Sequence, residues 1–218
     1  MKRIENPWML SVVVCLLSSV MAWAAPVVLN PSFEEPPFPG NPGGWDEGAG
    51  NPVGWTWNGG SHIGGVYGAG LAPQLTGAVK VLPVSDGVAA AYLWTAWSAD
   101  CTMSQTVNGF DVGKKYALMY LEGSQSGTAT DHFYVTLGGD TLVDHVIAAD
   151  ASAWNPIASP TFVASNTSLN LTFHVQALGD GDRSSVVFDA VSFTEIPEPT
   201  TAALALGGLV FALRRRRA

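Results

Sequence analysis

The feature that most constrains the fold of this chain is a two-residue alternation of apolar and polar side chains in its middle. From Leu169 to Val175 every odd position is apolar and every even position is polar. The stretch from His132 to Leu137 keeps the same period. A β-strand with this period turns one face to a core and the other to water. Because no segment of the middle keeps a helical period beyond about ten residues, the alternation predicts amphipathic strands.

Two other runs in the middle, Val88 to Trp97 and Tyr116 to Leu121, are apolar on both faces, as expected of strands covered on both sides. Turn signals rich in Gly, Asn and Asp separate the runs, and they are Asn108-Gly109, Asp111-Val112-Gly113, Gly138-Gly139-Asp140 and Gly179-Asp180-Gly181-Asp182. About eight short strands with this punctuation predict an all-β domain, a jelly-roll β-sandwich, over residues 25–195. The Gly- and Pro-rich stretch from Pro36 to Gly70 is predicted to form long loops around one strand near Gly54–Trp57.

The middle of the chain is strongly acidic, because most basic residues gather at the two ends while the formal net charge of the whole chain is −8. An acidic domain does not attract nucleic acid, so we expect no nucleic-acid partner. The charge favours either divalent cations or simply a soluble surface. Of the two cysteines, Cys15 lies in the apolar N-terminal run and Cys101 in the middle, which excludes an internal disulfide and a cysteine-based metal site.

The N-terminus has the three parts of a secretory signal peptide. Basic residues near the start are followed by an apolar run from Trp8 to Met21. Ala22 and Ala24 then supply small side chains at the two positions that signal peptidase inspects. We therefore expect residues 1–24 to be a helical signal peptide that is removed on export. The alternative is an uncleaved membrane anchor.

The C-terminus carries a short apolar run, Ala202 to Leu213, between a proline-rich segment and a basic cluster. The cluster is Arg214, Arg215, Arg216 and Arg217. As a helix the apolar run is about 18 Å long, shorter than the roughly 20 residues that a permanent membrane span needs. Arginines after the run favour a cytoplasmic C-terminus by the positive-inside rule. These residues predict a short C-terminal transmembrane helix that acts as an anchor.

The order of Pro197-Glu198-Pro199, short apolar helix and arginine cluster resembles the PEP-CTERM sorting signal, over residues 196–218. The resemblance implies recognition by an exosortase, a membrane transpeptidase-like enzyme of Gram-negative bacteria, and cleavage near Pro197, Glu198 and Pro199. It also implies export across the inner membrane, a transient anchor there, and a final place at the cell surface or in an extracellular polysaccharide matrix. The alternative is a plain tail anchor.

Short motifs in the middle resemble galactose-binding-like domains and the jelly rolls of carbohydrate-binding modules. They are Val28-Leu29-Asn30-Pro31-Ser32-Phe33-Glu34, Gly54-Trp55-Thr56, Ser104-Gln105-Thr106-Val107, Gly113-Lys114-Lys115-Tyr116 and Val187-Phe188-Asp189-Ala190-Val191. Ala190 departs from the family pattern, which removes any ligand role from that position. The resemblance implies a β-sandwich and a possible carbohydrate ligand.

Glu34 and Asp189 are the candidate metal ligands. Asp189 shares a face with apolar residues by the two-residue period, and a buried carboxylate is costly unless it is hydrogen-bonded or bound to a cation. In the jelly rolls that the chain resembles, acidic residues of the first and last strands often contribute to a structural Ca²⁺ site. Carboxylate oxygens suit Ca²⁺. The alternative is that neighbouring backbone N–H groups satisfy the carboxylates.

Aromatic residues supply a candidate carbohydrate site, because the apolar C–H faces of pyranose rings pack on aromatic rings. We select Trp45 and Trp57 as the most exposed of eight tryptophans, with Asn58 and His62 as nearby partners for sugar hydroxyls. Other polar groups that we considered for this role are Gln105 and Gln125. The alternative is that the tryptophans anchor the core and the loops.

The sequence favours a protein that is not an enzyme. Asp131, Asp144 and Glu122 are the carboxylates available for glycoside hydrolysis, but none lies in a recognisable catalytic motif. His132 and His145 are separated by one strand and a turn, and they are candidates for a two-histidine metal site. We therefore expect an exported, non-catalytic envelope or matrix protein with a possible polysaccharide ligand. The alternatives are a structural or adhesion protein without a small ligand and a secreted polysaccharide-processing enzyme.

Overall fold

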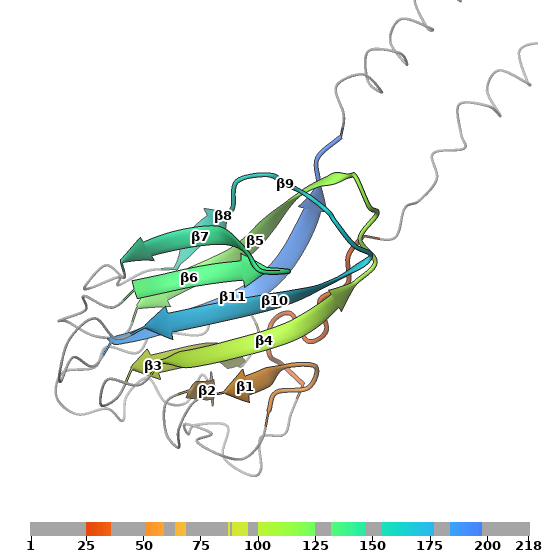
Figure 1. Cartoon of the computed structure of the whole chain (residues 1–218). Coiled ribbons are helices and arrows are strands. Elements are labelled where there is room, and N and C mark those ends of the chain that lie inside the picture. The colour runs from red at the N-terminus through yellow and green to blue at the C-terminus, as the bar shows by residue number, and fades with distance from the viewer. Residues whose placement is uncertain are drawn as a thin grey trace, which may run out of the picture.

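The structure, a computed structural model, describes residues 25–35, 51–58, 64–68, 87, 89–95, 100–124, 132–146, 154–176 and 184–197. Within these residues the regular secondary structure is β throughout, arranged as two sheets that face each other (Figure 1). The expected signal peptide, 1–24, and the expected transmembrane helix after Pro197 lie outside the described residues. In the described part of the chain, no helix has the length and apolarity needed to cross a membrane.

The first sheet contains β1 (Thr56–Asn58), β4 (Cys101–Asn108), β10 (Ser168–Gln176), β6 (His132–Leu137) and β7 (Asp140–Val146), in that spatial order. The second sheet contains β2 (Gly64–Gly68), β3 (Ala89–Thr95), β11 (Ser184–Glu195), β5 (Lys115–Ser124) and β8 (Asn155–Ala158), with β9 (Phe162–Val163) also pairing with β5. All strand pairs within the described residues are antiparallel. The predicted all-β, two-sheet sandwich is confirmed.

The alternating runs form the first sheet as the sequence predicts. Along β10 the odd residues from Leu169 to Val175 are buried, and along β6 the same holds for Phe133, Val135 and Leu137. The runs that are apolar on both faces form β3 and β5 of the second sheet. The two sheets meet through aromatic rings, because Phe173 of β10 stacks on Phe188 of β11 with 4.2 Å between ring centroids. Rings packed in this way contribute beyond the area that they bury.

A buried carboxamide fixes the N-terminal segment to the first sheet. Gln105 is only 4% exposed, and its Oε1 accepts a hydrogen bond from Leu29 N at 2.7 Å. Its Nε2 donates to Leu29 O at 2.9 Å. The Gln105 side chain thus makes the two hydrogen bonds that a neighbouring strand would make with the backbone of Leu29. These bonds also satisfy both polar groups of the buried carboxamide. This corrects our suggestion that Gln105 could bind sugar hydroxyls.

Both ends of the described chain lie at one end of the sandwich, which we call the termini end. Val27 N donates to Asn108 O at 2.9 Å, and Ile196 N donates to Lys115 O at 2.8 Å. The turn between β4 and β5 joins these places, and β4 and β11 both end there, on the right of Figure 1. His132 and Gln176, which are paired across β6 and β10, lie at the opposite end, which we call the far end.

Candidate functional site

The outer face of the first sheet is lined by small hydroxyl and amide side chains with three aromatic rings among them. Strand alternation directs these residues away from the core. They are Thr56, Asn58, Thr102, Ser104, Thr106, Asn108, His132, Tyr134, Thr136, Ser168, Asn170, Thr172, His174 and Gln176. Such a face is dense in hydrogen-bond donors and acceptors at the surface of the molecule.

The rings gather where β6 and β10 lie side by side. Tyr134 and His174 are cross-strand partners, and their rings stack with centroids 4.3 Å apart and planes 8° apart. The His132 ring is tilted against Tyr134 at a centroid distance of 5.1 Å. His174 Nε2 is 3.1 Å from Thr136 Oγ1, within hydrogen-bond distance. Three half-buried rings thus form one aromatic cluster on the outer face.

Burial lowers the pKa of His174 below its ordinary value, although the charge of Asp100 opposes the shift. The ring is therefore neutral at neutral pH, with one donor and one acceptor nitrogen. A neutral imidazole stacks on Tyr134 without bringing a charge onto the face. The stack consequently offers a neutral surface to a ligand.

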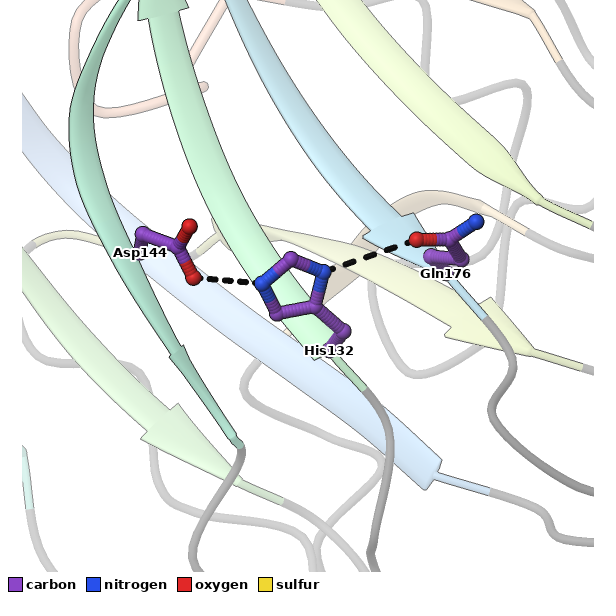
Figure 2. A network of polar contacts seen from close by, with 3 residues as sticks. All are labelled: His132, Asp144 and Gln176. Atoms are coloured by element: carbon purple, nitrogen blue, oxygen red, sulfur yellow. Dashed lines mark hydrogen bonds and ion pairs between the residues drawn. The ribbon is translucent and has the colours of Figure 1, made fainter.

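A polar network extends the cluster toward the far end of the sandwich, as Figure 2 shows. His132 Nε2 bonds to Asp144 Oδ1, and His132 Nδ1 lies 3.5 Å from Gln176 Oε1. The register places these groups together, because β6 pairs with β7 on one side and with β10 on the other. The Asp144 side chain is 58% exposed and that of His132 is 27% exposed. The network is therefore open to solvent and to a ligand.

A second polar cluster lies between the sheets, on the inner side of β7. His145 Nε2 is 2.7 Å from Glu122 Oε1, and Tyr120 Oη donates to Glu122 Oε2 at 2.9 Å. The hydrogen bond to Glu122 raises the pKa of His145 above its ordinary value, with the charges of Glu122 and Asp144 adding to the shift and burial opposing it. Burial, followed by the charge of Glu122, raises the pKa of Tyr120. Tyr120 therefore remains a protonated donor.

The structure does not bring the described candidates for a metal site or for catalysis to one place. His132 points outward and His145 inward, so they do not face a common ion. Among the residues that the structure describes, no three or more His, Cys, Asp or Glu side chains gather to hold a metal. Asp144 and Glu122 lie on opposite sides of the first sheet rather than across a cleft, and Asp131 lies outside the described residues.

Of the predicted sugar-binding residues the structure describes two, Trp57 and Asn58, and their side chains lie on opposite sides of β1. Trp57 is half-buried, packs against the core and donates from Nε1 to Cys101 Sγ at 3.1 Å. Asn58, the next residue of β1, points to the outer face and is exposed. Trp45 and His62 lie outside the described residues. Trp57 thus contributes to the side of β1 opposite to the one that carries Asn58.

The predicted calcium ligands both make hydrogen bonds with the backbone. Glu34 Oε1 accepts from Ala89 N at 3.0 Å, and Asp189 Oδ1 accepts from Ala190 N at 2.8 Å. Asp189 is fully buried. Beside it β11 has an irregular register, and Val191 N donates to Pro31 O at 3.0 Å, which brings the last strand to the segment that carries Glu34. The backbone alternative thus has direct support, while the oxygen-rich donor set also has the chemistry that Ca²⁺ prefers.

The processing residues lie almost entirely outside the described part of the chain. Pro197 is its last described residue, and it is exposed. The others are Ala22, Ala24, Glu198, Pro199, Arg214, Arg215, Arg216 and Arg217.

Comparison with known proteins identifies the fold. No protein-family model matches the chain, and no curated protein matches its sequence. A solved structure of the module TmCBM61, in complex with β-1,4-galactotriose, is similar with a TM-score of 0.53 and 15% identity, over 79% of this chain and all of the other. The CBM22-1 xylan-binding domain from Paenibacillus barcinonensis Xyn10C is similar with a TM-score of 0.43 and 17% identity, over 77% of this chain and 92% of the other. The similarity to TmCBM61 shows that the chain has the same β-sandwich fold.

Proposed function

We propose that this protein is a non-catalytic carbohydrate-binding protein, and that it binds an uncharged glycan on the outer face of the first sheet. The observation that carries the proposal is the stacked pair of Tyr134 and His174, set among hydroxyl and amide side chains. Aromatic rings pack against the C–H faces of pyranoses, and the surrounding polar groups bond to their hydroxyls. The His132–Asp144–Gln176 network adds exposed polar groups beside the rings.

The charge of this face favours an uncharged ligand. The strands of the first sheet, as far as the structure describes them, contain no Lys or Arg. Asp144 instead presents an exposed carboxylate beside the rings. A uronate or sulfated glycan would place its own negative charges near this group without a cation to receive them.

The fold similarity supports the same class of ligand. The module solved with β-1,4-galactotriose has this sandwich, so a neutral β-linked galactan is the natural first ligand to test. The other possible functions, a structural or adhesion role without a small ligand and polysaccharide processing, have no comparable group of residues in the described structure.

The test is isothermal titration calorimetry of the purified protein with neutral galactan, xylan and cellulose oligosaccharides, and with oligogalacturonate as the charged comparison. We expect binding to one or more neutral oligosaccharides and none to the uronate. Tyr134→Ala should weaken that binding about tenfold or more, equivalent to roughly 1.4 kcal/mol. Thr194→Ala, at an exposed position of β11 on the other sheet, is the control. Failure of every neutral glycan to bind would leave the structural role.

We also propose that the chain is exported, anchored and processed through its two ends. The signal peptide of residues 1–24 would be cut by signal peptidase after Ala24, and the segment of residues 196–218 would be recognised by an exosortase-type enzyme. The protein would then be at the cell surface or in the extracellular matrix. Mass spectrometry of the mature protein tests both steps, because it should start at Ala25 and end near Pro197–Pro199. An intact C-terminus ending in four arginines would contradict the second step.

We further propose a structural Ca²⁺ ion held by Glu34 and Asp189 together with backbone carbonyls. Bound calcium would stabilise the folded state by mass action. The melting temperature should therefore fall when a chelator replaces calcium in the buffer, and Asp189→Asn should abolish that difference. A melting temperature that does not respond to chelator would refute the calcium site.

A further inference from the structure

Strand β7 lies at one edge of the first sheet. Of the described strands of the first sheet, β7 and β1 are the two at the edges. The described pairing of β7 is with β6, and it changes register between Val135 and Thr136. A strand with one neighbour depends more on side-chain contacts than a central strand does. The contacts of its side chains with other strands therefore help to set where β7 lies.

Two successive residues of β7 make such contacts on opposite sides of the sheet. Asp144 points outward and bonds to His132 in the polar network. His145 points inward, where its ring lies 5.5 Å from that of Phe133 and its Nε2 is 2.7 Å from Glu122 Oε1. Glu122 belongs to β5 of the second sheet. The same short piece of backbone thus joins an interaction between the sheets to an interaction on the outer face.

Glu122 is well suited to hold its partner in place. Its side chain is 13% exposed, and each of its carboxylate oxygens has a hydrogen-bond partner, His145 on one and Tyr120 on the other. Tyr120 is 3% exposed and its ring packs on Phe173 at a centroid distance of 5.4 Å. The hydrogen bond from Tyr120 therefore restricts where the Glu122 carboxylate can lie, and with it the ring of His145. Hydrogen bonds with an ionised partner are about twice as strong as neutral ones.

We propose that Glu122 is a positioning residue for the outer face: through His145 it fixes β7 and thereby holds Asp144 against His132. The role of this arrangement in glycan recognition rests on the proposed function, but the mechanical link between the two clusters does not. Protonation of His145 strengthens its bond to Glu122, so the link is strongest when the imidazole carries a proton.

Among the described residues, three titratable side chains lie near His145. Glu122 and Tyr120 face it from β5, and Asp144 precedes it on β7. On β6 its cross-strand partner is Phe133, which does not titrate, and His132 points to the other side of the sheet. A change at His145 therefore reaches His132 through the backbone of β7 and the charge of Asp144.

The experiment is a histidine imidazole NMR titration of the whole protein, with glycan affinity measured on the same samples. In the wild-type protein the pH profile of the His132 signals should contain a step whose midpoint matches that of the His145 signals, and we call this step the His132 response. Glu122→Gln should lower the pKa of His145, remove that response of His132 and weaken glycan binding about fivefold or more, a usual size for coupling between sites. It should also flatten the pH dependence of the affinity.

Glu195→Gln is the matched control, because Glu195 forms an ion pair with Lys114 at the termini end, with 3.4 Å between the charged atoms. This variant makes the same chemical change and should leave the His132 signals unaltered. Tyr120→Phe is the second test variant, since it keeps the buried ring and removes only the hydrogen bond to Glu122. It should reduce the His132 response in part, and it serves if Glu122→Gln fails to fold.

The outcomes separate the two proposals. If the pKa of His145 falls in Glu122→Gln while the His132 signals keep their wild-type response, the positioning role is refuted, whatever glycan binds. If the His132 response is lost as expected but no glycan binds to the wild-type protein, the link between the clusters stands and the proposed function fails.

Discussion

Replacement of the buried Gln105 by leucine tests how the N-terminal segment is held. Leucine is close to glutamine in size, but it lacks both polar groups that bond to the backbone of Leu29, at 2.7 and 2.9 Å. Each hydrogen bond contributes a net of about 1 kcal/mol. Because the residue Leu29 is 52% exposed, its backbone can regain some contact with water after the change. We therefore expect a loss of about 2 kcal/mol rather than the larger cost of two fully buried unpaired groups.

Urea unfolding is the assay for this loss. The midpoint should fall while the slope of the transition stays constant, because the surface exposed on unfolding hardly changes. In a thermal scan about 2 kcal/mol corresponds to a fall of roughly 4–8 °C for a domain of this size. Hydrogen exchange should also show that the amide of Leu29 loses protection before the strands of the core do.

Gln176→Leu is the control for Gln105→Leu. Gln176 is exposed and its described contact, with His132, is 3.5 Å long, so the same substitution there should change stability by less than about 0.5 kcal/mol. A loss at Gln105 of under about 0.5 kcal/mol, or equal losses at both positions, would refute the reasoning. Such a result would mean that the N-terminal segment is held by other contacts.

Other substitutions probe the backbone, the core and the pH dependence. In Gly87→Ala the new Cβ would lie 2.3 Å from the carboxyl carbon of Glu34, whereas in Gly113→Ala it would meet no atom within 4 Å. Both glycines have a positive φ, so both substitutions should cost roughly 1–2 kcal/mol of backbone strain. Urea unfolding should therefore show the greater loss of stability for Gly87→Ala. Phe173→Ala should cost about 3–5 kcal/mol by the same assay, because its ring is fully buried; a loss below about 1 kcal/mol would show that the core refills the space. The lowered pKa of His174 means that the unfolded chain binds its proton more readily, so stability should decrease as the pH falls below the ordinary value of 6.5. His174→Gln should reduce this slope between pH 7 and 5, and identical slopes would contradict the assignment.

The inward faces of the strands were predictable because they follow from local sequence. The period of two from Leu169 to Val175 identifies the core side of β10, and that side is buried as expected. The same pattern lists Tyr134 and His174 among outward residues. Their stacking, however, depends on which residue of β6 lies opposite which residue of β10, and this register is a long-range property of the sheet. The aromatic cluster therefore could not be derived from the alternation.

Trp57 shows a second limit of local reasoning. Polar and glycine neighbours in the sequence suggest an exposed ring, but β1 has only three residues, too few for its alternation to show which side faces the core. Pairing with β4 decides the matter, because Trp57 lies opposite the buried Met103. Glu122 is similar, since its partner His145 comes from the other sheet. Contacts between sheets depend on packing that no short motif records.

The shared location of the two ends of the described chain has a consequence for multivalent binding. Copies of the domain attached to one support through either end would all turn the His132–Asp144–Gln176 network away from that support. A long glycan could then engage several copies at once, and each later contact would form at the high effective concentration set by the first. Weak single sites would in this way retain a polymer that none of them could hold alone.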